Sequence, residues 1–199
     1  MYYLNKKDDK KSIKKCETTI STSSVESNNN VIYFASDVNA ENNFKLNKQL
    51  RETELELRML SMKMGLGPVP IRLHISSFGG SVLSAFSTID CIKSLDVPVN
   101  TYIDGYAASA GTLMSVVGNW RIMGKNSYML IHQLSNLAWG NYEQLKDDMK
   151  NCDVFMKRIQ GIYEEHTRIP KKKLKKILKR DLWFDSKTCL EYGLVDEVI

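Results

Sequence analysis

Ser109 lies in a stretch of small residues that would leave its hydroxyl open to a substrate. The heptapeptide Gly105–Gly111 reads Gly-Tyr-Ala-Ala-Ser-Ala-Gly, and a helix is expected to begin within it. A helix N-terminus favours negative charge that develops beside a nucleophile. The spacing differs from the G-x-S-x-G elbow of many hydrolases. A serine that only caps the helix explains this stretch, taken alone, equally well.

His132 could supply the base that a nucleophilic serine requires. It follows the apolar run Tyr128–Ile131, where a neutral imidazole could take the hydroxyl proton while a carboxylate fixes its tautomer. The other histidines fit less well, because His74 lies in the middle of an alternating strand and His166 ends a long helix. A histidine after an apolar strand is more often structural, so its pairing with Ser109 carries this assignment. Spacing alone does not single out the carboxylate.

A third chemical feature is the paired glycine turn at Gly79–Gly80, which follows the alternating strand Ile71–Ile75. Two glycines let the backbone bend without a Cβ clash and present N–H groups to an anion. Such a turn is more often only a turn than a binding site.

Short apolar strands alternate with helices around these residues, and Asp104–Tyr106 is expected to form a turn. We expect strands at Val31–Phe34, Ile71–Ile75, Val99–Ile103, Trp120–Met123, Tyr128–Ile131, near Trp183 and at Leu194–Ile199. We expect helices around Leu46–Leu60, Val82–Ile92, from Ala108 onward, over Tyr142–His166, after Pro170 and over Lys187–Tyr192. This alternation predicts an α/β fold with a largely parallel sheet, whose reactive groups gather at the carboxyl ends of the strands.

The 199-residue length and the 43% apolar, 26% charged composition suit one globular domain. Residues 1–30 are polar and Lys-rich, so we predict a flexible extension there and a folded domain over 31–199. No apolar run is long enough to cross a membrane, and the N-terminus lacks the features of a secretory or ordinary transit peptide. A cytoplasmic protein is predicted; a plastid stroma or a virus-infected host cell remains open.

The polar residues predict neither a metal centre nor a nucleic-acid site. The four cysteines and three histidines are scattered without metal-ligand spacing, which favours reduced structural thiols. Although the net charge is +5, much of the basic charge lies in local runs such as Pro170–Arg180. The apolar stripe in that run is typical of a solvated surface helix, and no aromatic residues are interleaved with its lysines.

From Val31 to Ile199 the chain resembles the Clp protease proteolytic subunit, ClpP, of the Clp serine peptidases. The matching motifs are Gly79-Gly80-Ser81, Gly105–Gly111, Met129–Gln133, and Arg180-Asp181 followed by Phe184 and by Glu191–Asp196. The resemblance implies that Ser109 is the nucleophile, His132 the general base and Asp181 its orienting carboxylate. It also implies that the backbone N–H groups of Gly80 and Ala110 form the oxyanion hole.

The resemblance further implies a ClpP/crotonase-like α/β fold with repeated β-β-α units, in which residues 142–166 form a protruding handle helix. It implies heptameric rings of this or related subunits, stacked as a tetradecamer around a chamber. Unfolded polypeptides would be supplied by an AAA+ unfoldase of the ClpX, ClpA or ClpC type. That partner would consume ATP, while this subunit needs no cofactor or metal.

Two alternatives stay open at this stage. The first is a catalytically weak or inactive ring subunit, since Phe78 and Leu134 stand where the family usually has proline and Lys179 stands where it tends to carry an acid. The second is a crotonase acting on acyl-CoA thioesters with a carboxylate acid/base. The Ser109 and His132 pair argues against the crotonase, and neither proline replacement removes a catalytic group.

Overall fold

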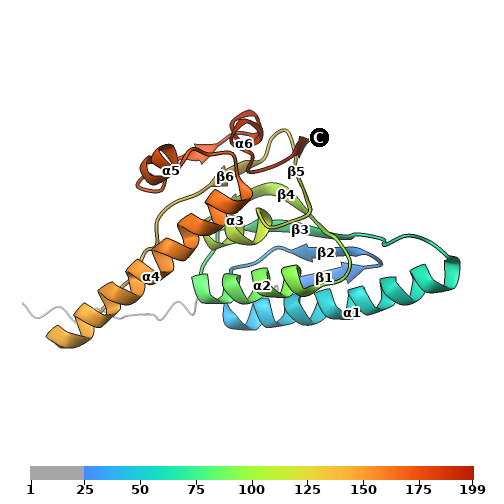
Figure 1. The fold of residues 1–199 in the computed structure, drawn as a ribbon, viewed down its shortest axis with the longest axis horizontal. Helices are drawn as coiled ribbons and strands as arrows, with labels where there is room; N and C mark the ends of the chain where they lie inside the picture. Colours follow the sequence, from blue (N-terminus) through green and yellow to red (C-terminus); the bar gives the residue numbers. More distant parts are fainter. Residues whose placement is uncertain (1–24) are drawn as a thin grey trace, which may run out of the picture.

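The computed structural model describes residues 25–199 and shows one mixed sheet with helices packed around it (Figure 1). The strands are β1 Val25–Asn28, β2 Val31–Phe34, β3 Ile71–Ser77, β4 Val99–Ala108, β5 Trp120–Met123, β6 Tyr128–Leu130, β7 Trp183–Phe184 and β8 Glu197–Val198. The helices are α1 Ala40–Met64, α2 Val82–Ser94, α3 Ala110–Ser115, α4 Tyr142–His166, α5 Lys171–Ile177 and α6 Ser186–Tyr192. No helix among these residues is both long and apolar enough to cross a membrane.

The sheet is largely parallel, as predicted. Its strands follow the order β1-β2-β3-β4-β5-β8, and β6 pairs with β4 and with β7. The antiparallel pairs within the described chain are β1 with β2 and β6 with β7. Since the β2, β3, β4 and β6 strands are mutually parallel where they pair, their carboxyl ends meet at one edge.

Strand β4 is longer than predicted and changes partner along its length. The expected turn at Asp104–Tyr106 is wrong, because the ten-residue strand continues through it to Ala108. Asn100–Ile103 pairs with β5, whereas Tyr106–Ala108 pairs with β6. The register between β3 and β4 shifts here, because Ile75 pairs with Ile103 and Ser77 with Ala107, so the extra residues lie in β4. The extra length brings the end of β4 beside the end of β6.

The N-terminal boundary of the fold also differs from the prediction. The flexible extension was expected to reach residue 30, but Val25–Asn28 forms β1, antiparallel to β2. Asn29 adopts a left-handed backbone with φ 55°, which suits the tight turn, and the Asn30 side chain donates to Pro70 O at 2.9 Å. Val25 packs against the core, which gives this polar segment its anchor. Residues 1–24, the rest of the predicted extension, lie outside the described residues.

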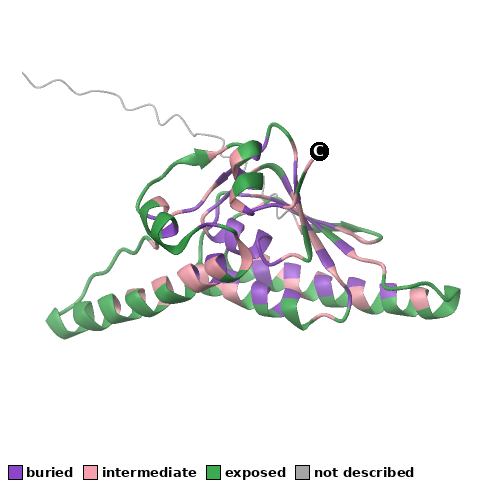
Figure 2. Cartoon of the chain, turned by 45° about the horizontal axis from the view of Figure 1, so that its top comes forward, coloured by how far each residue is buried: buried purple, intermediate pink, exposed green. Residues whose placement is uncertain are grey.

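Helices α1 and α2 lie side by side along one face of the sheet (Figure 1). Leu46, Leu50 and Leu57 of α1 are buried at helical spacing, as their sequence pattern indicates. Helix α4 differs, because its buried residues are confined to its C-terminal part: Ile159, Ile162 and Tyr163. Its N-terminal half projects from the body and is largely exposed (Figure 2). One end of α4 therefore belongs to the core while the other stands in solvent.

Candidate active site

Ser109 occupies the junction between β4 and α3 in a conformation that few non-glycine residues adopt. Its backbone has φ 52° and ψ −125°. Its N–H donates to Leu130 O at 2.8 Å, so the serine is held against the end of β6. Its side chain makes no capping hydrogen bond to α3. The capping alternative is therefore wrong, and strain of this kind, about 1–3 kcal/mol, is commonly stored at functional sites.

The paired glycine turn packs directly on the serine. A Cβ added to Gly79, where φ is +95°, would lie 2.7 Å from both Ala108 O and Ser109 Cβ. A Cβ on Gly80 would lie 2.3 Å from Val38 O. Close approach of three backbone segments thus explains why both positions are glycine.

His132 and the carboxylate of Asp181 form a hydrogen-bonded pair. The distance from His132 Nδ1 to Asp181 Oδ1 is 2.8 Å. The antiparallel pairing of Leu130 with Trp183 brings the two segments together. A carboxylate can only accept, so Nδ1 carries the proton and Nε2 of the neutral ring is free to take one. The imidazole is 24% exposed, whereas the carboxylate is 78% exposed.

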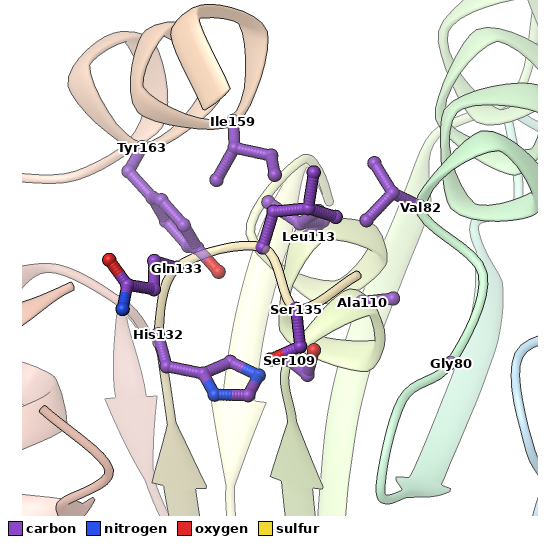
Figure 3. A pocket seen from close by; sticks show the side chains of 11 residues that line it. Gly80, Val82, Ser109, Ala110, Leu113, His132, Gln133, Ser135, Ile159 and Tyr163 are labelled. Carbon is purple, nitrogen blue, oxygen red and sulfur yellow. The ribbon is translucent and has the colours of Figure 1, made fainter. Parts of the chain in front are cut away.

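Ser109 and His132 face one cavity of about 230 Å³. Figure 3 shows the His132 ring directed toward Ser109 from the neighbouring strand end. The cavity is lined by Gly80, Val82, Ser109, Ala110, Leu113, His132, Gln133, Leu134, Ser135, Ile159 and Tyr163. The structure therefore brings together the two residues that local chemistry selected and both predicted oxyanion donors.

The orientation of the Gly80 N–H is fixed from the opposite side of its peptide unit. Gly79 O accepts from Val38 N at 2.8 Å, and Ser81 N donates to Val38 O at 2.7 Å. In a trans peptide the C=O and N–H point in opposite directions, so anchoring Gly79 O aims the Gly80 N–H away from Val38. Ala110 opens α3, where a backbone N–H has no partner within the helix. These are suitable donors for an anion that develops in the cavity.

Apolar side chains from three helices form the far wall of the cavity. Val82, Leu113 and Ile159 come from α2, α3 and α4 respectively, and they stand together in Figure 3. None of the lining side chains carries a permanent charge. The wall is suited to an apolar substrate side chain.

Aromatic rings brace the turn where a proline was expected. The Phe78 ring stacks on Tyr106 with centroids 4.2 Å apart and meets Trp183 edge-on at 6.4 Å. Such ring pairs stabilise a loop beyond the area that they bury. The turn before Gly79 thus keeps a defined shape without proline.

The other two histidines lie outside this cavity. His74 Nδ1 bonds Asp104 Oδ2 at 2.8 Å, and its ring stacks on Tyr102 in the sheet. His166 ends α4, where burial and the nearby charge of Lys93 lower its pKa. Residues 25–199 contain no group of three or more His, Cys, Asp or Glu side chains placed to hold a metal ion.

Some residues that shape the site were missed by sequence reasoning. Val38 acts only through its backbone, so no side-chain pattern marks it. Thr112 and Tyr163 lie behind Ser109 and are joined by a hydrogen bond of 2.7 Å between their hydroxyls. A threonine three residues after the serine is a recognisable local hydrogen-bonding pattern, whereas Tyr163 was hidden in the apolar stripe of α4.

Comparisons with known proteins show which family the chain resembles. A family model described as Clp protease matches residues 17–199. The ATP-dependent Clp protease proteolytic subunit of Deinococcus radiodurans is 31% identical over 131 residues, which cover 65% of this chain and 64% of that protein. The ATP-dependent Clp protease proteolytic subunit 2 of Treponema denticola is 29% identical over 156 residues, 77% of this chain and 78% of that one. The match to the first relative thus spans less than two thirds of its length.

A solved structure shares the fold. A ClpP1 mutant from Listeria monocytogenes superposes with a TM-score of 0.74 at 24% identity, covering 86% of this chain and 91% of that chain. At this identity the likeness shows the fold alone, and it confirms the predicted α/β fold class.

Proposed function

The chain belongs to the Clp protease family, and from this premise we propose that it is the proteolytic subunit of an ATP-dependent Clp protease, a serine endopeptidase. The observation that carries the proposal is the His132–Asp181 hydrogen bond of 2.8 Å beside a cavity that also holds Ser109. This pairing supplies a base with a defined tautomer. It lies next to a serine whose backbone is strained and whose side chain makes no capping hydrogen bond to α3.

Ser109 attacks the carbonyl carbon of a peptide bond, and its hydroxyl proton passes to His132 Nε2. The tetrahedral intermediate then collapses as His132 returns that proton to the leaving nitrogen, the C–N bond breaks and an acyl-enzyme forms. Water attacks the ester in the same way and gives its proton to His132. The C–Oγ bond breaks, Ser109 regains its proton, and the new carboxyl product leaves.

The negative oxygen of each tetrahedral intermediate is bound by the N–H groups of Gly80 and Ala110. Fixed backbone donors need no reorganisation as the charge develops, and loss of one such donor typically costs about 10²–10³ in rate. Asp181 stabilises the imidazolium that His132 becomes in each half-reaction.

The proposed substrates are unfolded polypeptides that bind in the cavity as extended chains. The apolar wall formed by Val82, Leu113 and Ile159 favours an apolar side chain beside the cleaved bond. An AAA+ unfoldase of the ClpX, ClpA or ClpC type would consume the ATP and deliver the chain. This subunit would act without cofactor or metal.

Heptameric rings of this or related subunits, stacked as a tetradecamer, are proposed as the working assembly. Leu137 and Trp139, just before α4, are 97% and 99% exposed, and the projecting half of α4 adds further exposed apolar residues. Large exposed apolar side chains in one region mark a surface that another chain covers. Native mass spectrometry should show a fourteen-subunit species, and monomers alone at micromolar concentration would contradict this assembly.

A fluorophosphonate probe tests the proposed activity directly. The assembled wild-type protein should be labelled, with peptide mapping placing the adduct on Ser109. Ser109→Ala should lose both the label and peptidase activity while keeping its melting temperature. Ser135→Ala is the matched control, because it removes another serine hydroxyl of the same cavity and should still be labelled on Ser109. An unlabelled wild-type ring would instead identify an inactive structural subunit.

A further inference from the structure

The carbonyl of Ser109 is held by two hydrogen bonds from one residue. Thr112 N donates to Ser109 O at 3.0 Å, and Thr112 Oγ1 donates to the same oxygen at 2.6 Å. Both acceptor positions of this carbonyl are therefore used. The neighbouring serine hydroxyl, by contrast, does not bond α3.

This carbonyl belongs to the same peptide unit as the Ala110 N–H. The unit is planar and trans, so its C=O and N–H point in opposite directions. A donor that fixes Ser109 O therefore also fixes the direction in which the Ala110 N–H points into the cavity. Hydrogen bonding at the carbonyl additionally polarises the unit and strengthens its N–H as a donor.

Tyr163 extends the same network to α4. The Thr112 hydroxyl has one hydrogen, which it gives to a carbonyl that can only accept. The 2.7 Å contact between Thr112 Oγ1 and Tyr163 OH must then be a donation from the tyrosine. Thr112 and Tyr163 are 0% and 1% exposed, so water does not compete for these bonds. Burial also raises the pKa of the Tyr163 phenol, which keeps it protonated.

The two oxyanion donors are consequently supported in different ways. The peptide unit of Gly80 is anchored by a backbone group, Val38 N. The peptide unit of Ala110 is anchored by Thr112 N and, in addition, by the Thr112 side chain, which the Tyr163 side chain orients. Of these bonds, only the one from the Thr112 hydroxyl can be removed by substitution without moving the backbone.

We propose that Thr112 and Tyr163 are positioning residues that aim the Ala110 N–H at the oxyanion, with Tyr163 acting through Thr112. This inference rests on the proposed function, because it assigns a role within the same serine peptidase site. It makes the C-terminal part of α4 a support for transition-state binding that acts through the Ala110 peptide unit.

Steady-state hydrolysis of a fluorogenic peptide by the assembled protein gives the first test. Thr112→Val keeps the side-chain shape and the backbone bond but removes the hydroxyl, so kcat should fall about tenfold while KM stays within twofold. The loss should be smaller than the 10²–10³ for a deleted donor, because the Ala110 N–H remains. Thr112→Ser restores the hydroxyl and should recover kcat. Tyr163→Phe should lower kcat about threefold.

Thr101→Val is the matched control for a merely structural role. Thr101 is also a buried threonine, and its Oγ1 donates to an α3 carbonyl, Ser115 O, at 2.7 Å, but it does not line the cavity. This variant should lower the melting temperature and leave kcat at the wild-type value. If Thr112→Val behaves in the same way as this control, the proposal is overturned.

Two further measurements separate positioning from packing. A peptide boronic acid forms a tetrahedral adduct on the nucleophile, so its affinity should fall in parallel with kcat/KM in Thr112→Val and stay unchanged in Thr101→Val. In the double variant, Tyr163→Phe should cause no further loss of kcat beyond Thr112→Val, because the tyrosine acts through the threonine. Additive losses, or unchanged boronate affinity, would refute the proposal.

The same experiments distinguish the two levels of inference. If fluorophosphonate fails to label Ser109 of the wild-type protein, the proposed function fails and the positioning role falls with it. If the wild type is labelled and Thr112→Val matches it in kcat and boronate affinity, the peptidase stands and only the positioning role is wrong.

Discussion

Replacing Gly79 with alanine tests the contact between the paired glycine turn and Ser109, the proposed nucleophile. An added Cβ would lie 2.7 Å from Ala108 O, 2.7 Å from Ser109 Cβ and 2.9 Å from Ala110 N. All three atoms belong to the segment that contains the proposed nucleophile and one proposed oxyanion donor. The substituted turn can relax only by pushing this segment toward the β6 side, where His132 lies, or by moving itself.

The expected destabilisation has two parts. An alanine at φ +95° costs about 1–2 kcal/mol of backbone strain. Overlap with packed atoms adds about 1–3 kcal/mol, so the free energy of unfolding should fall by about 2–5 kcal/mol. Displacement of a reacting group by 1 Å can cost about 10²-fold in rate. Peptidase activity should therefore fall about 100-fold in the protein that remains folded.

Gly105→Ala is the matched control on strand β4. Gly105 has a similar positive φ of +78°, but nothing lies within 4 Å of its added Cβ. It should show only the strain, about 1–2 kcal/mol, with little loss of activity. Urea denaturation and the rate of fluorophosphonate labelling measure the two effects. The reasoning fails if Gly79→Ala is labelled at the wild-type rate, or if its stability equals that of Gly105→Ala.

Three other predictions concern charge and thiol chemistry away from the cavity. Arg121 and Asp196 form an ion pair at 2.5 Å, and their side chains are 13% and 18% exposed. Arg121→Ala should therefore lower the free energy of unfolding, measured by urea denaturation, by about 3–5 kcal/mol. Arg58→Ala, which breaks an exposed ion pair, should lower it by less than about 1 kcal/mol. Burial tends to raise the pKa of Asp196, but the hydrogen bonds and charge of Arg121 outweigh it and hold that pKa below its ordinary value. The resulting stabilisation is present above about pH 4 and is lost as the pH falls through the folded-state pKa. Asp196→Asn should therefore lose less stability than the wild type when both are acidified through that range. Burial raises the pKa of the Cys189 thiol to about 12, so iodoacetamide at pH 8 should modify the partly exposed Cys152 before Cys189. Peptide mapping that found Cys189 modified before Cys152 would contradict this.

The parts of the fold that follow from local pattern were predictable. Hydrophobic spacing indicated α1, α2 and α4, and apolar runs indicated most strands. The missed part of β4, Asp104–Ala108, contains a glycine and an aspartate that are typical of turns. Its strand conformation depends on partners from β3 and β6, which local propensity does not contain.

In the candidate site, too, the residues marked by local sequence were predictable and those placed by tertiary contacts were not. Ser109 could be identified from the small residues around it, and His132 from the apolar strand that precedes it. Asp181 came only from the family resemblance, because its position depends on a short pairing between β6 and β7. The support from Thr112 and Tyr163 spans 51 residues, and a bond between distant hydroxyls leaves no periodic signal. The positions of these residues therefore depend on tertiary packing, which local sequence patterns do not reveal.

The position of Asp181 late in the chain also determines when the site can be completed during folding. The carboxylate follows its histidine by 49 residues and is brought in beside the two-residue strand β7. Most of the sheet is built from parallel pairs, whose distant partners close slowly. A chain that has formed β2, β3, β4 and β6 but has not docked β7 holds the serine and the base without the carboxylate. In such a chain His132 would lack its hydrogen bond to Asp181.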